Sequence, residues 1–113
     1  MTALTDNKNM FIALLLASGM AFDTGNTLYA QCLDQTLFSQ GRCVSYIRGV
    51  TDLVNTYQDA GIGSKLVCIP SNVTPGQLED IVVKDLRDDP VTRNQGAAGL
   101  VAATLMKAFP CAR

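Results

Sequence analysis

The chain has 113 residues, and its ten acidic and nine basic side chains leave a net charge of −1. This length supports one domain, and the balanced charge disfavours nucleic acid or an anionic membrane surface as a partner. The sequence contains no histidine, which is the commonest general base and the commonest zinc ligand. An enzyme is therefore disfavoured, and we expect no metal and no cofactor.

The first 21 residues have the features of a secretory signal peptide. Lys8 precedes an apolar run from Met10 to Phe22, and the small residues Gly19 and Ala21 occupy the −3 and −1 positions of a cleavage site. This run is shorter than the roughly 20 residues that a transmembrane helix needs. The alternative, suggested by a weakly charged start, is an N-terminal core helix. We expect cleavage after Ala21, which leaves residues 22–113 as a soluble exported domain without membrane contact.

Four cysteines follow the proposed cleavage point: Cys32, Cys43, Cys68 and Cys111. An even number of cysteines in a short exported chain favours a disulfide framework. The spacings contain no C-x-x-C pair, which argues against redox catalysis, and a zinc site would need an unusually dispersed cluster. We therefore expect two structural disulfides.

Four helices are predicted after the signal peptide, and the first two precede residue 60. The first is expected at 25–33 with Thr24 as its N-cap, and the second at about 42–59 with Ser39 as its cap. The core face of the second helix follows from its three- and four-residue spacing, and comprises Cys43, Ile47, Val50, Val54 and Tyr57. Gly49 costs this helix about 1 kcal/mol relative to alanine, which we interpret as a sign that a neighbouring helix approaches closely; a ligand contact is the alternative.

The third helix has the most clearly marked start in the sequence. Thr74 is expected as the N-cap, Pro75 as the first helical residue and Gln77 as the second member of a capping box. Its apolar side comprises Leu78, Ile81, Val82 and Leu86. Asp80 and Lys84 are spaced to form an ion pair on the exposed side. The helix ends before the next proline.

The fourth helix, expected at about 95–109, is apolar almost all round and should be the most enclosed element. The predicted fold class is all-α, a small four-helix bundle stapled by disulfides. If the helices run up and down, Cys32 meets Cys43 at one pole, and Cys68 meets Cys111 at the other. Among the three connectivities open to four cysteines, this topology favours 32–43 and 68–111.

Four blocks of the sequence resemble a known family. They read "TGNTLYAQC", "CVSYIRGVTD", "CIPSNVTPGQLEDIVVKDLRDDP" and "AAGLVAATLMKAFPC". In this order they are similar to the Rap/Tai immunity family of small periplasmic bacterial proteins, over about residues 24–111. The more specific features are the second cysteine followed by Tyr46, the turn after Cys68 and the closing Phe109-Pro110-Cys111.

The resemblance implies a fold, a partner and a location. Members of this family are all-helical, disulfide-bonded and often dimeric. They protect a bacterium from peptidoglycan amidases delivered by type VI secretion, because they bind the toxin and block its active-site cleft. The chain is therefore expected to be a periplasmic immunity protein, with an amidase effector as its partner and a homodimer as its assembly.

The connection between the third and fourth helices is our candidate for partner contact. Its polar residues are Arg87, Asp88, Asp89, Arg93 and Asn94. Loops carry the variable contacts on a fixed scaffold, so this connection would determine which toxin is recognised. The alternative interpretation is an ordinary solvated surface. At the level of function, the alternative is a small periplasmic structural or chaperone-like binding protein with no cognate toxin.

Overall fold

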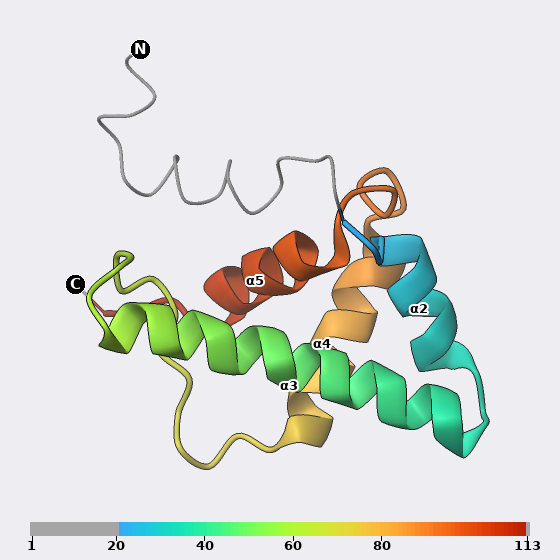
Figure 1. Ribbon diagram of the computed structural model, residues 1–113, viewed down its shortest axis with the longest axis horizontal. Coiled ribbons are helices and arrows are strands. Elements are labelled where there is room, and N and C mark those ends of the chain that lie inside the picture. The colour runs from blue at the N-terminus through green and yellow to red at the C-terminus, as the bar shows by residue number, and fades with distance from the viewer. Residues whose placement is uncertain (1–20, 113) are drawn as a thin grey trace.

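The computed structural model describes residues 21–112, which fold into four helices (Figure 1). The helices are α2 (Gly25–Leu33), α3 (Leu37–Asp59), α4 (Pro75–Asp88) and α5 (Ala97–Ala108). In Figure 1, α3 and α5 extend along the long axis of the molecule, while α2 and α4 run across them. The expected all-α class with four helices is confirmed. The proposed signal peptide lies outside the described residues, except for Ala21.

One hydrophobic core joins all four helices. Each helix contributes to this core, and so does the connection between α3 and α4, residues 60–74. The largest fully buried side chains are Leu28, Cys43, Ile47, Val67, Val82, Val101 and Leu105. Among the four helices α5 buries the most residues, in agreement with its almost wholly apolar sequence. Burying a leucine or valine side chain contributes about 1.5–3 kcal/mol, so this shared core is the main stabilising feature of the fold.

Helix α3 begins at Leu37, five residues before the expected start at residue 42, so both that start and the Ser39 cap were wrong. The N-cap is Thr36, whose hydroxyl accepts the Ser39 N–H at 3.2 Å. Asp34 supports this cap by accepting the Thr36 N–H at 2.9 Å and the Ser39 hydroxyl at 3.1 Å. These hydrogen bonds, first that from the Thr36 backbone, lower the pKa of Asp34. The first turn was missed because its apolar residues, Leu37 and Phe38, are exposed and so give no core periodicity.

The inward face of α3 largely agrees with its predicted spacing. Cys43, Ile47 and Val54 are buried, and Val50 is partly buried against the core. Tyr57 was wrongly included, because its side chain is 42% exposed. Thr51 is buried in addition, and its hydroxyl donates to the Ile47 carbonyl at 2.7 Å, which satisfies the polar group inside the core.

The expected close approach of a helix at Gly49 is also wrong. Gly49 is exposed, and a Cβ atom placed there would meet nothing within 4 Å. Gly41, on the same helix, has equally open surroundings. Within residues 21–112, only Gly61, just beyond the end of α3, has a positive φ, which is +74°. This left-handed residue directly follows the C-cap Ala60 and ends the helix.

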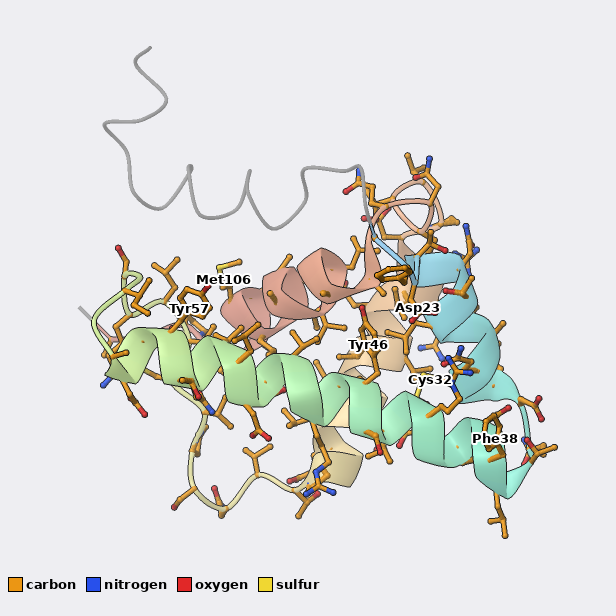
Figure 2. All side chains as sticks on the ribbon, viewed as in Figure 1. Asp23, Cys32, Phe38, Tyr46, Tyr57 and Met106 are labelled. Carbon is orange, nitrogen blue, oxygen red and sulfur yellow. A yellow bond between two sulfur atoms is a disulfide. The ribbon has the colours of Figure 1, made fainter. Side chains whose placement is uncertain are left out.

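Both predicted disulfides are present, and their pairing is the one that the helical topology favoured. Cys32 and Cys43 connect α2 to α3, with their Cα atoms 5.0 Å apart. The disulfide bond between Cys68 and Cys111 joins the α3–α4 connection to the last residues of the described chain, and the two Cα atoms are 4.9 Å apart. In Figure 2, Cys32 lies toward one end of α3, whereas Gln58, near the other end of α3, holds Val67, the neighbour of Cys68. The two staples therefore hold opposite ends of the fold.

Helix α4 begins with the predicted capping box. The Thr74 hydroxyl accepts the Gln77 N–H at 3.2 Å, and the Gln77 side chain accepts the Thr74 N–H at 2.7 Å, with Pro75 in the first helical position. The predicted Asp80–Lys84 pair is replaced by one on the following turn, because Lys84 contacts Asp88 at 2.5 Å. Lys84 therefore reaches toward the C-terminal end of α4.

The α3–α4 connection, residues 60–74, is held by one glutamine of α3. The Gln58 side-chain oxygen accepts the N–H groups of Leu66 and Val67 at 2.9 Å each, and its amide nitrogen donates to the Val67 carbonyl at 2.9 Å. Three backbone groups of a long loop thus find partners in one side chain. The adjacent Cys68 N–H donates to the Phe109 carbonyl at 2.8 Å, which places the loop beside the end of α5.

Candidate protein-binding site

The connection between α4 and α5, residues 89–96, lies against the start of α2. The first amides of a helix have no partner within the helix. Here the Gly25 N–H donates to the Gln95 carbonyl at 2.9 Å, and the Asn26 N–H donates to the Arg93 carbonyl at 2.7 Å. A Cβ on Gly25 would lie 2.8 Å from the Arg93 carbonyl oxygen, so this approach requires glycine. The loop therefore caps α2 through its backbone.

The residues before α2 cap α5 in return. Gly96, the N-cap residue of α5, offers no side chain, and the Ala97 N–H instead donates to the Asp23 carbonyl at 2.8 Å. Thr24 and Gly96 form an isolated antiparallel bridge next to this bond. The start of the described chain and the base of the α4–α5 connection consequently form one unit.

Arg93 belongs to the support of this connection. Its side chain is half-buried, and its guanidinium carbon lies 4.7 Å from the centre of the Tyr29 ring. A cation above an aromatic face at this distance contributes about 0.5–1 kcal/mol at an exposed site and more when it is desolvated. Among the five predicted contact residues, Arg93 therefore has an evident structural role.

The other four predicted residues, Arg87, Asp88, Asp89 and Asn94, are exposed. Arg87 lies 3.5 Å from Asp88, which also pairs with Lys84. The hydrogen bond from Lys84 is the largest of the effects that lower the pKa of Asp88. Arg87, Asp88 and Asp89, which are consecutive in the sequence, are thus all exposed at the end of α4, and Asn94 lies on the loop that follows.

Sequence reasoning missed an exposed apolar residue in the same loop. The Val91 side chain is 84% exposed, directly after Pro90. A single exposed valine is common on protein surfaces, so no sequence signal marks it as special. Its position between charged candidates nevertheless adds an apolar contact to the loop.

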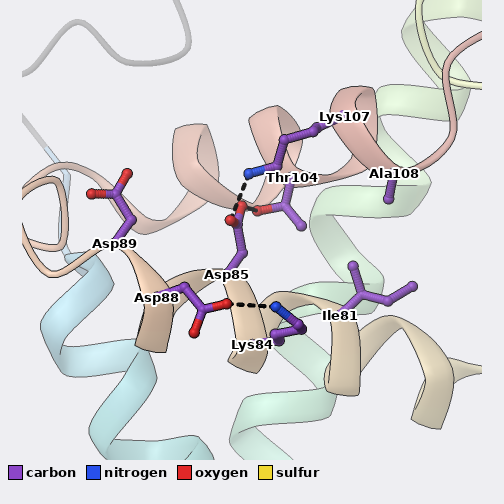
Figure 3. Close-up of a pocket in the computed structure, with 8 residues that line it drawn as sticks. All are labelled: Ile81, Lys84, Asp85, Asp88, Asp89, Thr104, Lys107 and Ala108. Atoms are coloured by element: carbon purple, nitrogen blue, oxygen red, sulfur yellow. Dashed lines mark hydrogen bonds and ion pairs between the residues drawn. The ribbon is translucent and has the colours of Figure 1, made fainter.

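A groove between α4 and α5 continues from this loop. It has a volume of about 510 Å³, and its lining residues come from both helices (Figure 3). A smaller hollow of about 240 Å³ shares Asp85, Asp89 and Lys107 with the groove and reaches Thr92 and Gln95 of the loop. The exposed loop and the groove thus form one continuous surface, which we call the α4–α5 surface.

Asp85 connects the two walls of the groove. Its carboxylate accepts hydrogen bonds from Lys107 at 2.6 Å and from Thr104 at 2.5 Å, as Figure 3 shows. Burial alone would raise the pKa of Asp85, but the hydrogen bonds from Lys107 and Thr104 outweigh it and the pKa is lowered. Asp85 is thus ionised at neutral pH and is already paired, which suits a structural link better than a proton donor. Sequence periodicity could not reveal this link, because its partners belong to different helices.

The described chain shows no grouping that would hold a metal ion. Within residues 21–112, no three histidine, cysteine, aspartate or glutamate side chains come together in a way that could ligate one. In the same range, no helix is both long enough and apolar enough to cross a membrane.

These features define a class of protein. Two staples and one core hold a polar loop and a charged groove on the outside of a small all-α scaffold, an arrangement suited to recognising another protein. A family model for Rap1a immunity proteins matches residues 24–111. The chain therefore belongs to the Rap1a immunity protein family, and membership implies a toxin effector as its partner.

The matched range coincides with structural landmarks. It begins at Thr24, the N-cap of α2, and ends at Cys111, the last cysteine of the second staple. The family unit is thus the complete disulfide-linked four-helix fold. No curated protein and no solved structure matched this chain.

Proposed function

We propose that this protein is a periplasmic immunity protein that binds and inhibits a peptidoglycan amidase effector delivered by type VI secretion. The observation that carries the proposal is membership of the Rap1a immunity family over residues 24–111. The amidase as target follows from the resemblance of the four sequence blocks to immunity proteins against such enzymes. A homodimer is part of the same proposal.

The α4–α5 surface is the proposed contact with the amidase. Its exposed part offers the charged residues Arg87, Asp88 and Asp89 and the apolar Val91, while Arg93 and the backbone bonds to α2 fix its base. A loop held in one conformation before binding loses little entropy on association, so affinity is gained without new contacts. An inhibitor that blocks a cleft benefits from this rigidity and does not need catalytic residues of its own.

The proposed export is compatible with the folded domain. Cleavage after Ala21 would leave a chain that starts at Phe22, whose side chain is 98% exposed. The next residue, Asp23, provides the carbonyl that caps α5, so the mature chain would keep every contact described above. We expect the intact mass of the periplasmic form to correspond to a start at Phe22. A full-length cytoplasmic product would contradict export.

A binding and rescue experiment tests the function. We expect a candidate amidase from the same gene neighbourhood to be toxic when it is directed to the periplasm, and co-expression of this protein should restore growth. Charge reversal by Arg87→Glu should weaken amidase binding roughly tenfold, because it removes a positive charge from the contact. Lys65→Glu is the matched control, since Lys65 is an exposed basic residue on the α3–α4 connection and should not change binding.

Two outcomes separate the alternatives. If Arg87→Glu and Lys65→Glu both bind as tightly as the parent protein, the α4–α5 surface is not the contact. If no amidase from the same gene neighbourhood binds the parent protein, inhibition of an amidase is refuted. The structural or chaperone-like alternative would then replace it.

A further inference from the structure

The two disulfides differ in how far the surrounding fold covers them. Cys32 and Cys43 belong to helices α2 and α3 and are buried in the core, where they are 7% and 0% exposed. Cys68 and Cys111 lie outside the four helices, and both are partly exposed. A thiol that attacks a disulfide must reach one of its sulfur atoms. The Cys68–Cys111 bond is therefore the more accessible of the two.

A hollow beside Cys68 increases this accessibility. It has a volume of about 500 Å³, and Cys68 is one of its lining residues. One wall comes from the last turns of α3, with Asn55, Gln58 and Asp59, and the other comes from the α3–α4 connection, with Lys65. Sites for small molecules have volumes of about 300–1,000 Å³. The hollow can therefore admit a thiol reagent to the side of Cys68.

The backbone contacts that hold Cys68 near the end of α5 are local. The Cys68 N–H donates to the Phe109 carbonyl at 2.8 Å, and Val67 forms an isolated bridge with Pro110. The Cys32–Cys43 bond instead joins two helices within the shared core, so a reagent reaches it only after α2 separates from α3. Local opening costs less free energy than disruption of a core. Attack on the Cys68–Cys111 bond thus needs the smaller opening.

We propose that the Cys68–Cys111 disulfide is a site of thiol–disulfide exchange with an external dithiol, whereas the Cys32–Cys43 disulfide is a structural staple. A thiolate of the dithiol attacks one sulfur atom of the pair, and a mixed disulfide forms. The other cysteine leaves as a thiolate and takes up a proton. The second thiol of the reagent, once deprotonated, displaces the remaining cysteine, which is protonated in turn. The protein gains two electrons and two protons, and the dithiol becomes a disulfide.

Exchange at this site loosens one part of the protein and spares another. The reduced protein loses the bond between the α3–α4 connection and the segment after α5. The loop of the α4–α5 surface is held separately, by backbone bonds to α2 and by the contact of Arg93 with Tyr29. Reduction therefore lowers the stability of the fold and leaves the support of that loop in place. This inference goes beyond the proposed function and does not depend on it.

Limited reduction of the purified, disulfide-bonded protein tests the proposal. The native protein is treated with dithiothreitol, free thiols are blocked with iodoacetamide at successive times, and peptide mass mapping identifies the labelled cysteines. Cys68 and Cys111 should be labelled together and roughly tenfold faster than Cys32 and Cys43, because access limits the rate. A species labelled only at Cys68 and Cys111 should accumulate and keep the helical content of the parent protein in circular dichroism. Equal rates for the two bonds, or faster reduction of Cys32–Cys43, would overturn the proposal.

Two tryptophan variants test the hollow as the route to the bond. Asn55→Trp places a large side chain in the hollow and should slow the reduction of Cys68–Cys111 roughly tenfold. Thr56→Trp is the matched control, because Thr56 is the next residue of α3, is exposed and does not line the hollow. If Asn55→Trp loses helical content, Lys65→Trp on the facing wall replaces it. Equal reduction rates in the filled and the control variants would overturn the hollow as the route.

A second reagent distinguishes the source of the dithiol. A purified, reduced protein with a C-x-x-C pair is used in place of dithiothreitol, under the same conditions. Selective reduction of Cys68–Cys111 by both reagents shows that a protein dithiol is a competent partner, whereas selective reduction by dithiothreitol alone assigns the site to small thiols. If dithiothreitol reduces neither bond while the protein stays folded, the proposal is overturned.

Discussion

The two long connections of this molecule are held in different ways. The α3–α4 connection is fixed by the Cys68–Cys111 bond and by the side chain of Gln58. The α4–α5 connection has no staple of its own and is fixed by backbone hydrogen bonds to α2 and by the stacking of Arg93 on Tyr29. The first depends on a covalent link across the chain, whereas the second depends on the start of α2. Each loop is therefore ordered by its own contacts with neighbouring elements, in addition to the hydrophobic core.

The largest predicted effect concerns the covalent link. The Cys68–Cys111 bond closes a sequence separation of 43 residues, for which the chain-entropy model gives about 4 kcal/mol of stabilisation. The double variant Cys68→Ala, Cys111→Ala should therefore lose a stability of this order. Denaturant unfolding of the parent and the variant measures it. A loss below about 1 kcal/mol would mean that the α3–α4 connection is held chiefly by other contacts.

The second-largest loss in the free energy of unfolding is expected for Gln58→Ala. It leaves two amides and one carbonyl of the α3–α4 connection without their partner, and we expect a loss of about 2 kcal/mol. Gln35→Ala is the matched control, because Gln35 is exposed and its substitution should stay within about 0.5 kcal/mol. If both variants unfold at the same denaturant concentration, the network at Gln58 does not stabilise the loop.

A comparison of two arginines tests the support of the α4–α5 connection. Arg93→Ala removes the cation from the Tyr29 ring and should cost about 1 kcal/mol in the free energy of unfolding. Arg87→Ala removes an exposed side chain near the same loop and should cost less than about 0.5 kcal/mol. Thermal or denaturant unfolding of the two variants gives the difference. Equal costs would show that Arg93 has no supporting role.

The Asp85 link should give a dependence on pH. The pKa of Asp85 is lowered in the folded protein, so its stabilisation is complete at neutral pH and is lost as the pH falls below about 4 through the folded pKa. Asp85→Asn should therefore be less stable than the parent by about 1 kcal/mol at neutral pH. Unfolding measured across the acid range should show this difference shrinking as the parent becomes protonated. A difference that stays constant in acid would contradict an ionised Asp85.

Local signals in the sequence predicted the features that depend on neighbouring residues. Thr74, Pro75 and Gln77 form the predicted start of α4, because a capping box is complete within four residues. The start of α3 was misplaced because Thr36 and Ser39 are chemically similar caps. The folded structure decides between these two caps. It shows that Leu37 and Phe38 form the first turn of α3 although their side chains are exposed.

Features that depend on packing could not be predicted in the same way. The stacking of Arg93 on Tyr29 and the pairing of Asp85 with Lys107 join residues on separate elements, whose mutual position follows from the core. The disulfide pairing was predictable because the helical topology itself separates the cysteines into two poles. Gly49 was recognised as unusual, but the sequence alone suggested a neighbour within the chain, and the structure places this residue on an open face.

Inhibition is tested most directly by titrating a candidate amidase from the gene neighbourhood with the purified, disulfide-bonded protein. Peptidoglycan hydrolysis is followed as the protein is added. Hydrolysis should fall in proportion to the added protein and stop when every amidase molecule is bound, while the Arg87→Glu variant should require a clear excess. Full hydrolysis in the presence of a large excess of the parent protein would contradict the claim that this protein is an amidase inhibitor.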